Sequence, residues 1–352
     1  MTVLLEAQHV TKIFSGGMFK TTGVVALRDF SLTIDVESPS IISVVGESGS
    51  GKSTMARLLL GLEAPTSGAV LYRGKRLQDL SRAEKHQFRR DVQIVFQDPF
   101  AAYNPIYKVD RVLEVPIAKF GLARSNAEKR ALIEEALEAV GLRPMDTLGR
   151  YPHQLSGGQR QRIMVARALL LRPKLIIADE PVSMIDASLR ASVLDALRQL
   201  NQQFGISLIY ITHDLTTAYQ IGHNIIVLYS GSVAEAGGIE TVVKQPQHPY
   251  TQLLIDSIPQ PNPERQWQDE APASELGQKA SASDGCRFAP RCPHAFEPCV
   301  QAAPPLYQTR PHQVAACYLY QEQPVVPSEK MDEVFARRTP LTNGKRLENG
   351  VV

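Results

Sequence analysis

The first 285 residues of this 352-residue chain contain no cysteine, and all four cysteines fall in the last fifth, at Cys286, Cys292, Cys299 and Cys317. This asymmetry makes the cysteines a local feature. A surplus of one charge sign is also missing, because 38 basic residues face 36 acidic ones, for a net charge of +2. No basic tract with interleaved aromatic residues occurs. We therefore expect no nucleic-acid partner.

Long apolar runs are missing as well. The longest stretch near the middle without Asp, Glu, Lys or Arg covers residues 215–234 and contains seven Ser, Thr, Asn, Gln or His residues, among them His223 and Asn224. Such a stretch is too polar to span a bilayer. The first residues, MTVLLEAQ, have neither a basic start nor an apolar core, so no signal peptide is expected. If the protein serves a membrane, it does so as a peripheral subunit.

Apolar runs alternate with helical patterns along most of the chain, and 43% of the residues are hydrophobic. Alternation of this type predicts an α/β fold with a mainly parallel sheet and helices on both faces. Residues 3–14 and 24–36 predict an antiparallel β subdomain, and residues 98–171 predict an inserted helical subdomain. We expect one domain over residues 1–258, a Pro- and Ser-rich linker over 259–285 and a Cys-rich extension over 286–320. For the tail, 321–352, the pattern predicts no fold.

The stretch GESGSGKS, residues 46–53, fits the pattern G-x-x-x-x-G-K-S between a predicted strand and a predicted helix. In that context its backbone N–H groups cradle phosphates, while Lys52 reaches the β- and γ-phosphates of ATP and the Ser53 hydroxyl binds Mg²⁺. A chance glycine-rich turn is the alternative, and the strand–loop–helix context disfavours it. The predicted nucleotide-binding residues are Gly46, Glu47, Ser48, Gly49, Ser50, Gly51, Lys52, Ser53 and Thr54.

An apolar strand, LIIADE, ends in two acids, Asp179 and Glu180. Asp179 can hold Mg²⁺ through water, and Glu180 can polarise the water that attacks the γ-phosphate. Alone, such a pair is usually part of a solvated loop; after a phosphate-binding loop the catalytic interpretation is favoured. Gln97 and His213 each end another predicted strand, and by themselves would be ordinary polar residues.

A second candidate phosphate cradle is LSGGQ, residues 155–159, where Ser156 and two glycines open a predicted helix. Free backbone N–H groups at a helix start suit a phosphate.

The ordered set Phe14, GESGSGKST, Gln97, LSGGQ, LIIADE, Asp186 and His213 resembles the nucleotide-binding subunit of ATP-binding-cassette (ABC) transporters over about residues 3–250. The resemblance implies that Phe14 stacks on adenine, that Gln97 touches Mg²⁺ and the attacking water while its loop contacts the membrane subunits, and that His213 contacts the γ-phosphate. It also implies that Asp186 lies in a loop linking two ATP sites, although SMID departs from the common Ser-Ala-Leu-Asp.

In that family two subunits pair head to tail. The resemblance therefore implies that Ser156, Gly157, Gly158 and Gln159 close over ATP held by the partner's phosphate-binding loop. One chain then carries halves of two sites. This pattern disfavours a P-loop kinase or a GTPase, since neither explains LSGGQ and no Asn-Lys-x-Asp guanine reader is found. A soluble ABC protein acting on ribosomes or DNA is a more distant alternative.

The stretch HPYTQLLIDSIP, residues 248–259, with the following cysteines and FQDPFAAYNP, residues 96–105, resembles the ATPase subunits of dipeptide, oligopeptide and nickel importers. This resemblance implies a second homologous ATPase subunit, identical or different, two membrane permeases and an extracytoplasmic solute-binding protein. It places the chain peripherally on the cytoplasmic face of the inner (plasma) membrane. The expected function is ATP hydrolysis that powers uptake of peptides, with nickel, sugars or other small solutes as alternatives.

The cysteine spacing is C-x5-C-x6-C-x17-C from Cys286 to Cys317. Four thiols in a segment with few aliphatic residues suggest that a metal organises it. Spacing alone leaves the metal open, because neither the close pairs of zinc sites nor the tight ferredoxin run is present. Resemblance to the importer branch favours a 4Fe–4S cluster on all four thiols, with zinc second. Because a linker precedes it, the segment is expected to act apart from the ATP site, in a structural or redox-sensing role.

Overall fold

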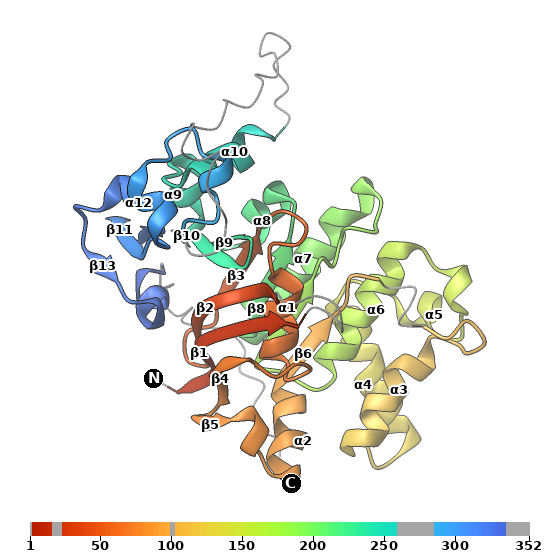
Figure 1. Cartoon of the computed structure of the whole chain (residues 1–352). Helices are drawn as coiled ribbons and strands as arrows, with labels where there is room; N and C mark the ends of the chain where they lie inside the picture. The colour runs from red at the N-terminus through yellow and green to blue at the C-terminus, as the bar shows by residue number, and fades with distance from the viewer. Residues whose placement is uncertain (1, 16–22, 99–102, 259–284, 336–352) are drawn as a thin grey trace.

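The computed structural model of the chain describes residues 2–15, 23–98, 103–258 and 285–335, and two β-sheets organise it (Figure 1). The nine-stranded sheet has the order β13-β11-β12-β10-β9-β3-β8-β7-β6, and its β9-β3-β8-β7-β6 part is parallel. Its parallel strands are β3 (Ile41–Val45), β6 (Val92–Val95), β7 (Leu175–Asp179), β8 (Ser207–Thr212) and β9 (Asn224–Tyr229). The predicted α/β fold with a mainly parallel core is confirmed.

The parallel strands read as continuous apolar runs because both of their faces are buried. Ile176, Leu208 and Tyr210 belong to one hydrophobic cluster, whereas their neighbours Ile177 and Ile209 belong to another on the opposite face. Side chains alternate between the faces of a strand, so each strand supplies two cores. Because these strands are parallel, their carboxyl ends lie at the same edge of the sheet. The predicted site residues come directly after these ends in the sequence.

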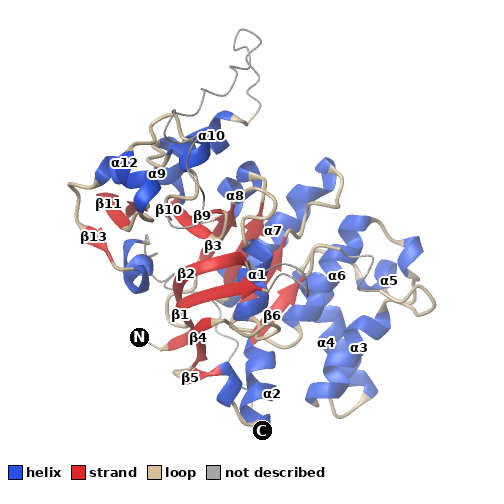
Figure 2. Ribbon diagram, viewed as in Figure 1, coloured by secondary structure: helices blue, strands red, loops and turns tan. Residues whose placement is uncertain are grey.

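A four-stranded antiparallel sheet, order β2-β1-β4-β5, covers one of these cores (Figure 2). Its strands are β1 (Val3–Phe14), β2 (Val24–Asp35), β4 (Ser67–Tyr72) and β5 (Lys75–Arg76). Between this sheet and the main sheet lies α1 (Lys52–Leu59), whose Met55 and Leu58 are fully buried. The phosphate-binding loop therefore leads into a helix held between two sheets.

A helical arm lies between β6 and β7, at the right of Figure 1. Its helices are α3 (Asp110–Phe120), α4 (Asn126–Ala139), α5 (Pro144–Thr147), η2 (Pro152–Gln154) and α6 (Gly157–Leu169), preceded by η1 (Leu77–Asp79) and α2 (Arg82–Asp91) before β6. The Ser125 hydroxyl caps α4 by accepting the N–H of Glu128. This arm shares its hydrophobic core with α7 (Ala187–Phe204) of the main body.

The chain beyond β9 continues the main sheet. The elements there are α8 (Leu215–Ile221), before β9, then β10 (Ser232–Gly238), α9 (Ile239–Lys244), α10 (Pro249–Asp256), η3 (Ala289–Arg291), α12 (Glu297–Gln301), β11 (Leu306–Arg310), β12 (Gln313–Ala315), η4 (Tyr318–Tyr320), β13 (Val325–Val326) and η5 (Ser328–Val334). Strand β12 pairs with β10, so residues after the linker extend the same sheet. The linker expected over 259–285 lies, except for Gly285, outside the described residues.

Residues 321–335 differ from the sequence prediction, which gave them no fold. Met331, Val334 and Phe335 are buried in the core beneath β1 and β2. The hydrophobic residues of this stretch show neither α-helical nor strand periodicity, because η5 is a short 3₁₀ segment. The rest of the expected tail, 336–352, lies outside the described residues.

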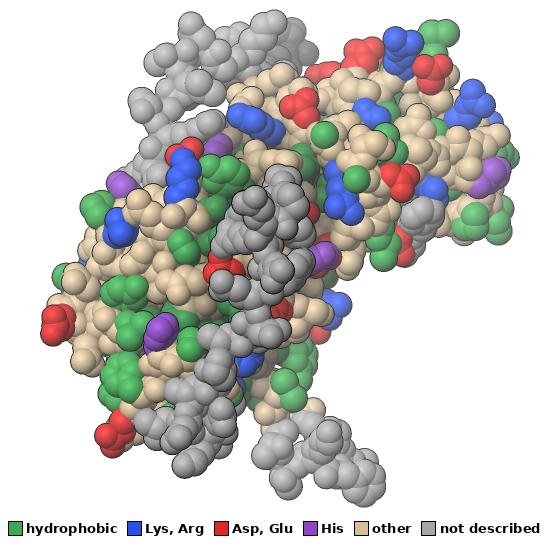
Figure 3. Space-filling view, turned by 90° about the horizontal axis from the view of Figure 1, so that it is seen from above, with side chains coloured by type: hydrophobic (Ala, Val, Ile, Leu, Met, Phe, Trp, Pro, Cys, Tyr) green, Lys and Arg blue, Asp and Glu red, His purple; other side chains and the backbone are tan. Residues whose placement is uncertain are grey.

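On the face in Figure 3, Lys and Arg side chains are scattered among Asp and Glu rather than gathered by sign. Of the helices that the structure describes, none has the length and apolar character needed to cross a membrane.

Candidate functional site

The phosphate-binding loop connects β3 to α1 and is built on glycines that no other residue could replace. Gly46 has φ 155°, and a Cβ there would lie 2.1 Å from the carbonyl oxygen of Leu228. Gly51, the residue before α1, has φ 101°, and its Cβ would lie 2.4 Å from the oxygen of Ala26. The backbone can therefore wrap closely, as a phosphate cradle requires.

Lys52 lies inside this loop. Its Nζ donates to the carbonyl oxygens of Gly46 (2.7 Å) and Glu47 (2.8 Å), and the residue is only 6% exposed. Burial lowers the pKa of Lys52, although Glu180 and Asp179 nearby favour its charged form. No side chain caps the start of α1, because the residue before it is Gly51. The first N–H groups of α1 are therefore available to an anion, so the loop fits the phosphates of ATP.

The candidate Mg²⁺ ligands meet at the start of α1. The Ser53 hydroxyl lies 3.5 Å from Oδ1 of Asp179, which ends β7. Burial raises the pKa of Asp179, and the neighbouring charge of Glu180 raises it further. Mg²⁺ needs only one or two protein oxygens because phosphates and waters fill the rest of its octahedron, so this pair fits the ion. Mg²⁺ would neutralise negative charge on the phosphates there.

Glu180 lies at the centre of a polar cluster. Its Oε2 accepts a hydrogen bond from Nε2 of Gln97 at 3.1 Å, and its Oε1 lies 3.1 Å from Nδ1 of His213. Its backbone has φ 46°, a left-handed conformation that is uncommon for a non-glycine residue and costs about 1–3 kcal/mol. A hydrogen bond from its N–H to the oxygen of Ile211, at 2.8 Å, holds this conformation. The fold thus aims one carboxylate between the ends of three strands.

Two further predicted residues stand at element ends. Phe14 ends β1, is 38% exposed, and has the Nζ of Lys12 4.9 Å from its ring centre. Asp186 precedes α7 and is exposed, without a side-chain hydrogen bond to the helix. Both side chains are open to an incoming group. Ser48 and Gly49, at the tip of the phosphate-binding loop, are exposed too, and Thr54 is half-buried.

The second candidate cradle starts α6, in the helical arm. Ser156 and Gln159 form a capping box, in which each side chain accepts the other's backbone N–H, at 3.2 Å and 2.9 Å. At Gly158 a Cβ would lie 3.2 Å from Cβ of Leu189 on α7, so a glycine lets the two helices approach. Gly157 has open space around it, its nearest neighbour being an oxygen at 3.8 Å. The two cradles therefore belong to different parts of the chain, the main sheet and the arm.

The prediction of a 4Fe–4S cluster, with zinc as its alternative, is wrong. Within the described residues, which include all four cysteines, no group of three or more His, Cys, Asp or Glu side chains could hold a metal ion. The cysteines are free thiols. Burial raises the pKa of Cys292 to about 11 and that of Cys317 to about 12, as expected for thiols packed among apolar side chains.

The cysteine segment needs no metal because it shares a core with the main sheet. Cys292 and Cys299 pack in a cluster with Val45, Ile225 and Val227 of the parallel strands. Buried thiols act there as small apolar side chains. Counting aliphatic residues within the segment alone could not detect this, since its core partners lie far earlier in the sequence.

The segment does not lie apart from the ATP site, as the preceding linker had suggested. Arg291, in η3, donates through Nη1 to both carboxylate oxygens of Glu47, at 3.1 and 3.0 Å. The hydroxyl of Tyr250, in α10, accepts the backbone N–H of Glu47 at 2.9 Å. No local sequence pattern signals these contacts, because the partners are 244 and 203 positions apart.

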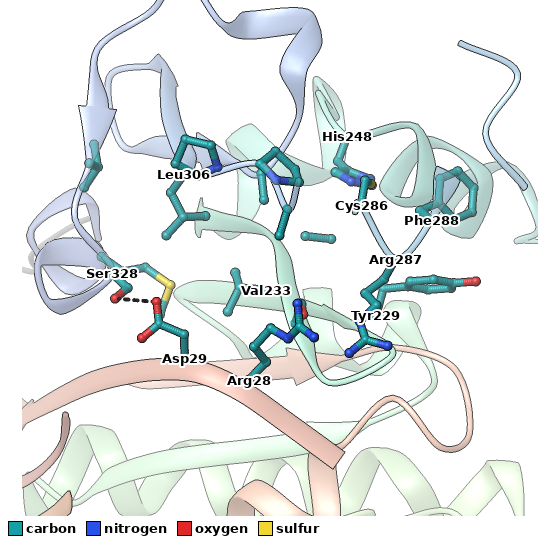
Figure 4. A pocket seen from close by; sticks show the side chains of 18 of the residues that line it. Arg28, Asp29, Tyr229, Val233, His248, Cys286, Arg287, Phe288, Leu306 and Ser328 are labelled. Carbon is teal, nitrogen blue, oxygen red and sulfur yellow. Dashed lines mark hydrogen bonds between the residues drawn. The ribbon is translucent and has the colours of Figure 1, made fainter. Parts of the chain in front are cut away.

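A cavity of about 330 Å³ separates the cysteine segment from β2 and the β9–β10 hairpin (Figure 4). Arg28 and Asp29 line it from β2, while Cys286 and Phe288 line it from the opposite side. Ser328 and Asp29 join across its rim at 3.4 Å.

A buried lysine in a glycine loop, with Asp179 and Glu180 at the end of the neighbouring strand, is typical of a P-loop ATPase. The family model of ABC transporters matches residues 27–183, and that of the oligopeptide/dipeptide transporter C-terminal region matches 234–299. The chain belongs to the ATP-binding proteins of ABC transporters, in their oligopeptide/dipeptide branch. It is an ATPase that binds ATP with Mg²⁺.

Two relatives illustrate the similarity. The putative oligopeptide transport ATP-binding protein YkfD of Bacillus subtilis is 39% identical over 319 residues, 90% of this chain and 95% of that protein. The di/tripeptide transport ATP-binding protein DppF of Pseudomonas aeruginosa is 38% identical over 317 residues, 90% of this chain and 97% of its own.

Solved structures agree with the fold. A dimeric post-hydrolysis state of the ATP-binding cassette MJ0796 with ADP and Pi has a TM-score of 0.59 and 32% identity, and covers 67% of this chain and 99% of that one. The cbiO1 subunit of an ABC transporter complex from Clostridium perfringens also has a TM-score of 0.59, at 25% identity, and covers 70% and 92%.

Proposed function

We propose that this chain hydrolyses ATP to drive the uptake of peptides, as one of two ATPase subunits that pair head to tail beneath two membrane permeases. An extracytoplasmic solute-binding protein supplies the peptide, and the chain sits on the cytoplasmic face of the membrane. The match of residues 234–299 to the oligopeptide/dipeptide transporter region, together with relatives named for peptides, supports the substrate class.

The single observation that carries the mechanism is the position of Glu180 between Gln97 and His213, one residue after Asp179. In the proposed reaction Lys52 and the loop N–H groups hold the β- and γ-phosphates of ATP. Ser53 and Asp179 would bind the Mg²⁺ ion. Glu180 then accepts a proton from the attacking water, and Gln97 and His213 orient the water and the γ-phosphate.

The separation of the two cradles supports pairing with a second subunit. Ser156 opens α6 in the arm, whereas Lys52 opens α1 under the antiparallel sheet (Figure 1). If two chains pair in opposite orientation, one phosphate can be bound by the Lys52 loop of one chain and by the Ser156 helix start of the other. ATP would then join the subunits, and its hydrolysis would release them.

A groove beside Gln97 suits the permease. Its volume is about 770 Å³, and its lining includes Ser53 and Asp179 of the ATP site and Tyr107 and Val115 of the arm. Tyr107 and Val115 are 43% and 38% exposed, and Ile106 next to them is 77% exposed. Exposed apolar side chains gathered beside a catalytic glutamine suit a partner that senses the state of the ATP site.

The test is to measure ATP hydrolysis by the purified chain alone and in the complex that co-purifies with it from membranes. The isolated chain should be a weak ATPase, and the complex should be stimulated by its solute-binding protein loaded with a peptide. Nickel or a sugar in place of the peptide should not stimulate it. Full activity from a monomer would contradict the head-to-tail site, and stimulation by nickel or sugar alone would contradict the substrate class.

A further inference from the structure

Glu47 in the phosphate-binding loop joins both α10 and the Cys-rich extension to Lys52. Its N–H donates to the Tyr250 hydroxyl at 2.9 Å, and its carbonyl oxygen accepts from Nζ of Lys52 at 2.8 Å. Its carboxylate accepts from Nη1 of Arg291, at 3.1 and 3.0 Å. Every polar group of Glu47 is thus used, and two of its partners, Tyr250 and Arg291, lie outside the predicted nucleotide-binding residues.

Tyr250 is a rigid anchor for this contact. Its side chain is fully buried, and its ring centre lies 4.5 Å from that of Tyr229 and 5.6 Å from that of Phe288. Its own N–H donates to Nδ1 of His248, which caps α10, at 3.0 Å. Because the ring cannot turn without disturbing this packing, the hydroxyl presents a fixed acceptor to the loop.

Arg291 holds the same loop residue from the solvent side. Its guanidinium carbon lies 5.7 Å from the ring centre of Phe288 and 5.9 Å from that of Tyr229, so aromatic faces orient it. The side chains of Arg291 and Glu47 are 34% and 45% exposed, and a pair this open contributes little to folding. Its two-oxygen contact does fix the direction of the Glu47 side chain.

We propose that Tyr250 of α10 and Arg291 of the Cys-rich extension are positioning residues of the ATP site, which hold Glu47, and with it Lys52, in the conformation that receives phosphates. The proposal rests on the phosphate-binding role of Lys52 proposed above. It assigns to the extension a part in nucleotide affinity in addition to its packing on the sheet.

The experiment titrates the full-length chain with a fluorescent ATP analogue and Mg²⁺, and measures KM and kcat for ATP in the complex. Tyr250→Phe keeps the ring and removes the acceptor, so affinity should fall about fivefold. Arg291→Gln should weaken it about two- to threefold, and Arg291→Lys should restore part of the loss. For each variant KM should rise while kcat stays within about twofold of the wild-type value.

Arg310→Ala is the matched control, since Arg310 is an exposed arginine of the same extension and should leave affinity unchanged. The double variant, Glu47→Gln with Arg291→Gln, should bind the ATP analogue no more weakly than whichever of the two single variants binds it less tightly. Both substitutions remove the same contact, so their effects should not add. Thermal unfolding verifies that each variant is folded. If Tyr250→Phe does not fold, the Arg291 variants still test the proposal.

Wild-type affinity in folded Arg291→Gln, or simple addition of the two single effects in the double variant, would overturn the proposal. Lys52→Ala separates the two levels of inference. If Lys52→Ala binds ATP normally, the proposed site itself is wrong. If Lys52→Ala loses binding while the Arg291 and Tyr250 variants bind normally, only the positioning role is wrong.

Discussion

Replacing Glu180 by Gln is the sharpest test of the proposed chemistry, because it changes charge without changing shape. The carboxylate is 17% exposed, accepts from Gln97 at 3.1 Å and lies 3.1 Å from Nδ1 of His213. A glutamine can keep both contacts by turning its amide oxygen toward Gln97 and its amide nitrogen toward His213. The strained backbone, with φ 46°, suits either residue equally. The negative charge is lost, and with it the ability to accept a proton.

The expected loss follows from that single change. A positioned general base contributes about 10²- to 10⁴-fold to a rate, so kcat should fall by at least about a hundredfold, or about 3 kcal/mol in the activation barrier. ATP affinity should stay within a few-fold, because Lys52 and the loop are untouched. The ATP-bound dimer should then become long-lived.

The assay is steady-state ATP hydrolysis by the complex, combined with gel filtration of the isolated variant in MgATP. Glu240→Gln, on the exposed surface of α9, is the matched control and should hydrolyse ATP at the wild-type rate. Turnover by Glu180→Gln at that same rate would refute Glu180 as the base. Loss of ATP binding would instead show that its charge supports the nucleotide site.

Two further predictions concern charge and burial. Lys52→Ala should reduce ATP hydrolysis about a hundredfold or more, because the γ-phosphate loses its main protein cation, and near-normal hydrolysis by the complex would refute the phosphate-binding loop. His248 is buried, its Nδ1 accepts an N–H, and burial lowers its pKa from 6.5 to about 4. Since the unfolded chain binds the proton first, its stabilising contribution is present above about pH 6.5 and is lost as the pH falls toward about 4. His248→Asn keeps a hydrogen-bond acceptor but does not titrate. The free energies of unfolding of the variant and the wild type are measured with denaturant at several pH values. Their difference should shift in favour of the variant by on the order of 2–3 kcal/mol as the pH falls from about 6.5 to about 4. A constant difference between the two chains would show that His248 does not titrate there.

The sequence by itself determined the family, the ATPase class and the mainly parallel sheet. Local patterns suffice for these, because the glycine loop, the Asp179–Glu180 pair and the apolar strands each need only neighbours in the chain. The strands of the main sheet end at one edge, so Gln97, Glu180 and His213 could be expected to meet there. What sequence could not supply was the strained φ of Glu180, which depends on the hydrogen bond to Ile211 on the next strand.

Only the tertiary structure decided the role of the C-terminal extension. The cysteine spacing suggested a metal because the segment has few aliphatic residues with which to build a core of its own. In the structure, Cys292 and Cys299 share a core with Val45 and Val227, which lie far earlier in the chain. In the same way, Arg291 reaches Glu47 across 244 positions. Periodicity and spacing report what a segment can do with its own residues, whereas burial and long-range pairing depend on which surfaces the sheet brings together.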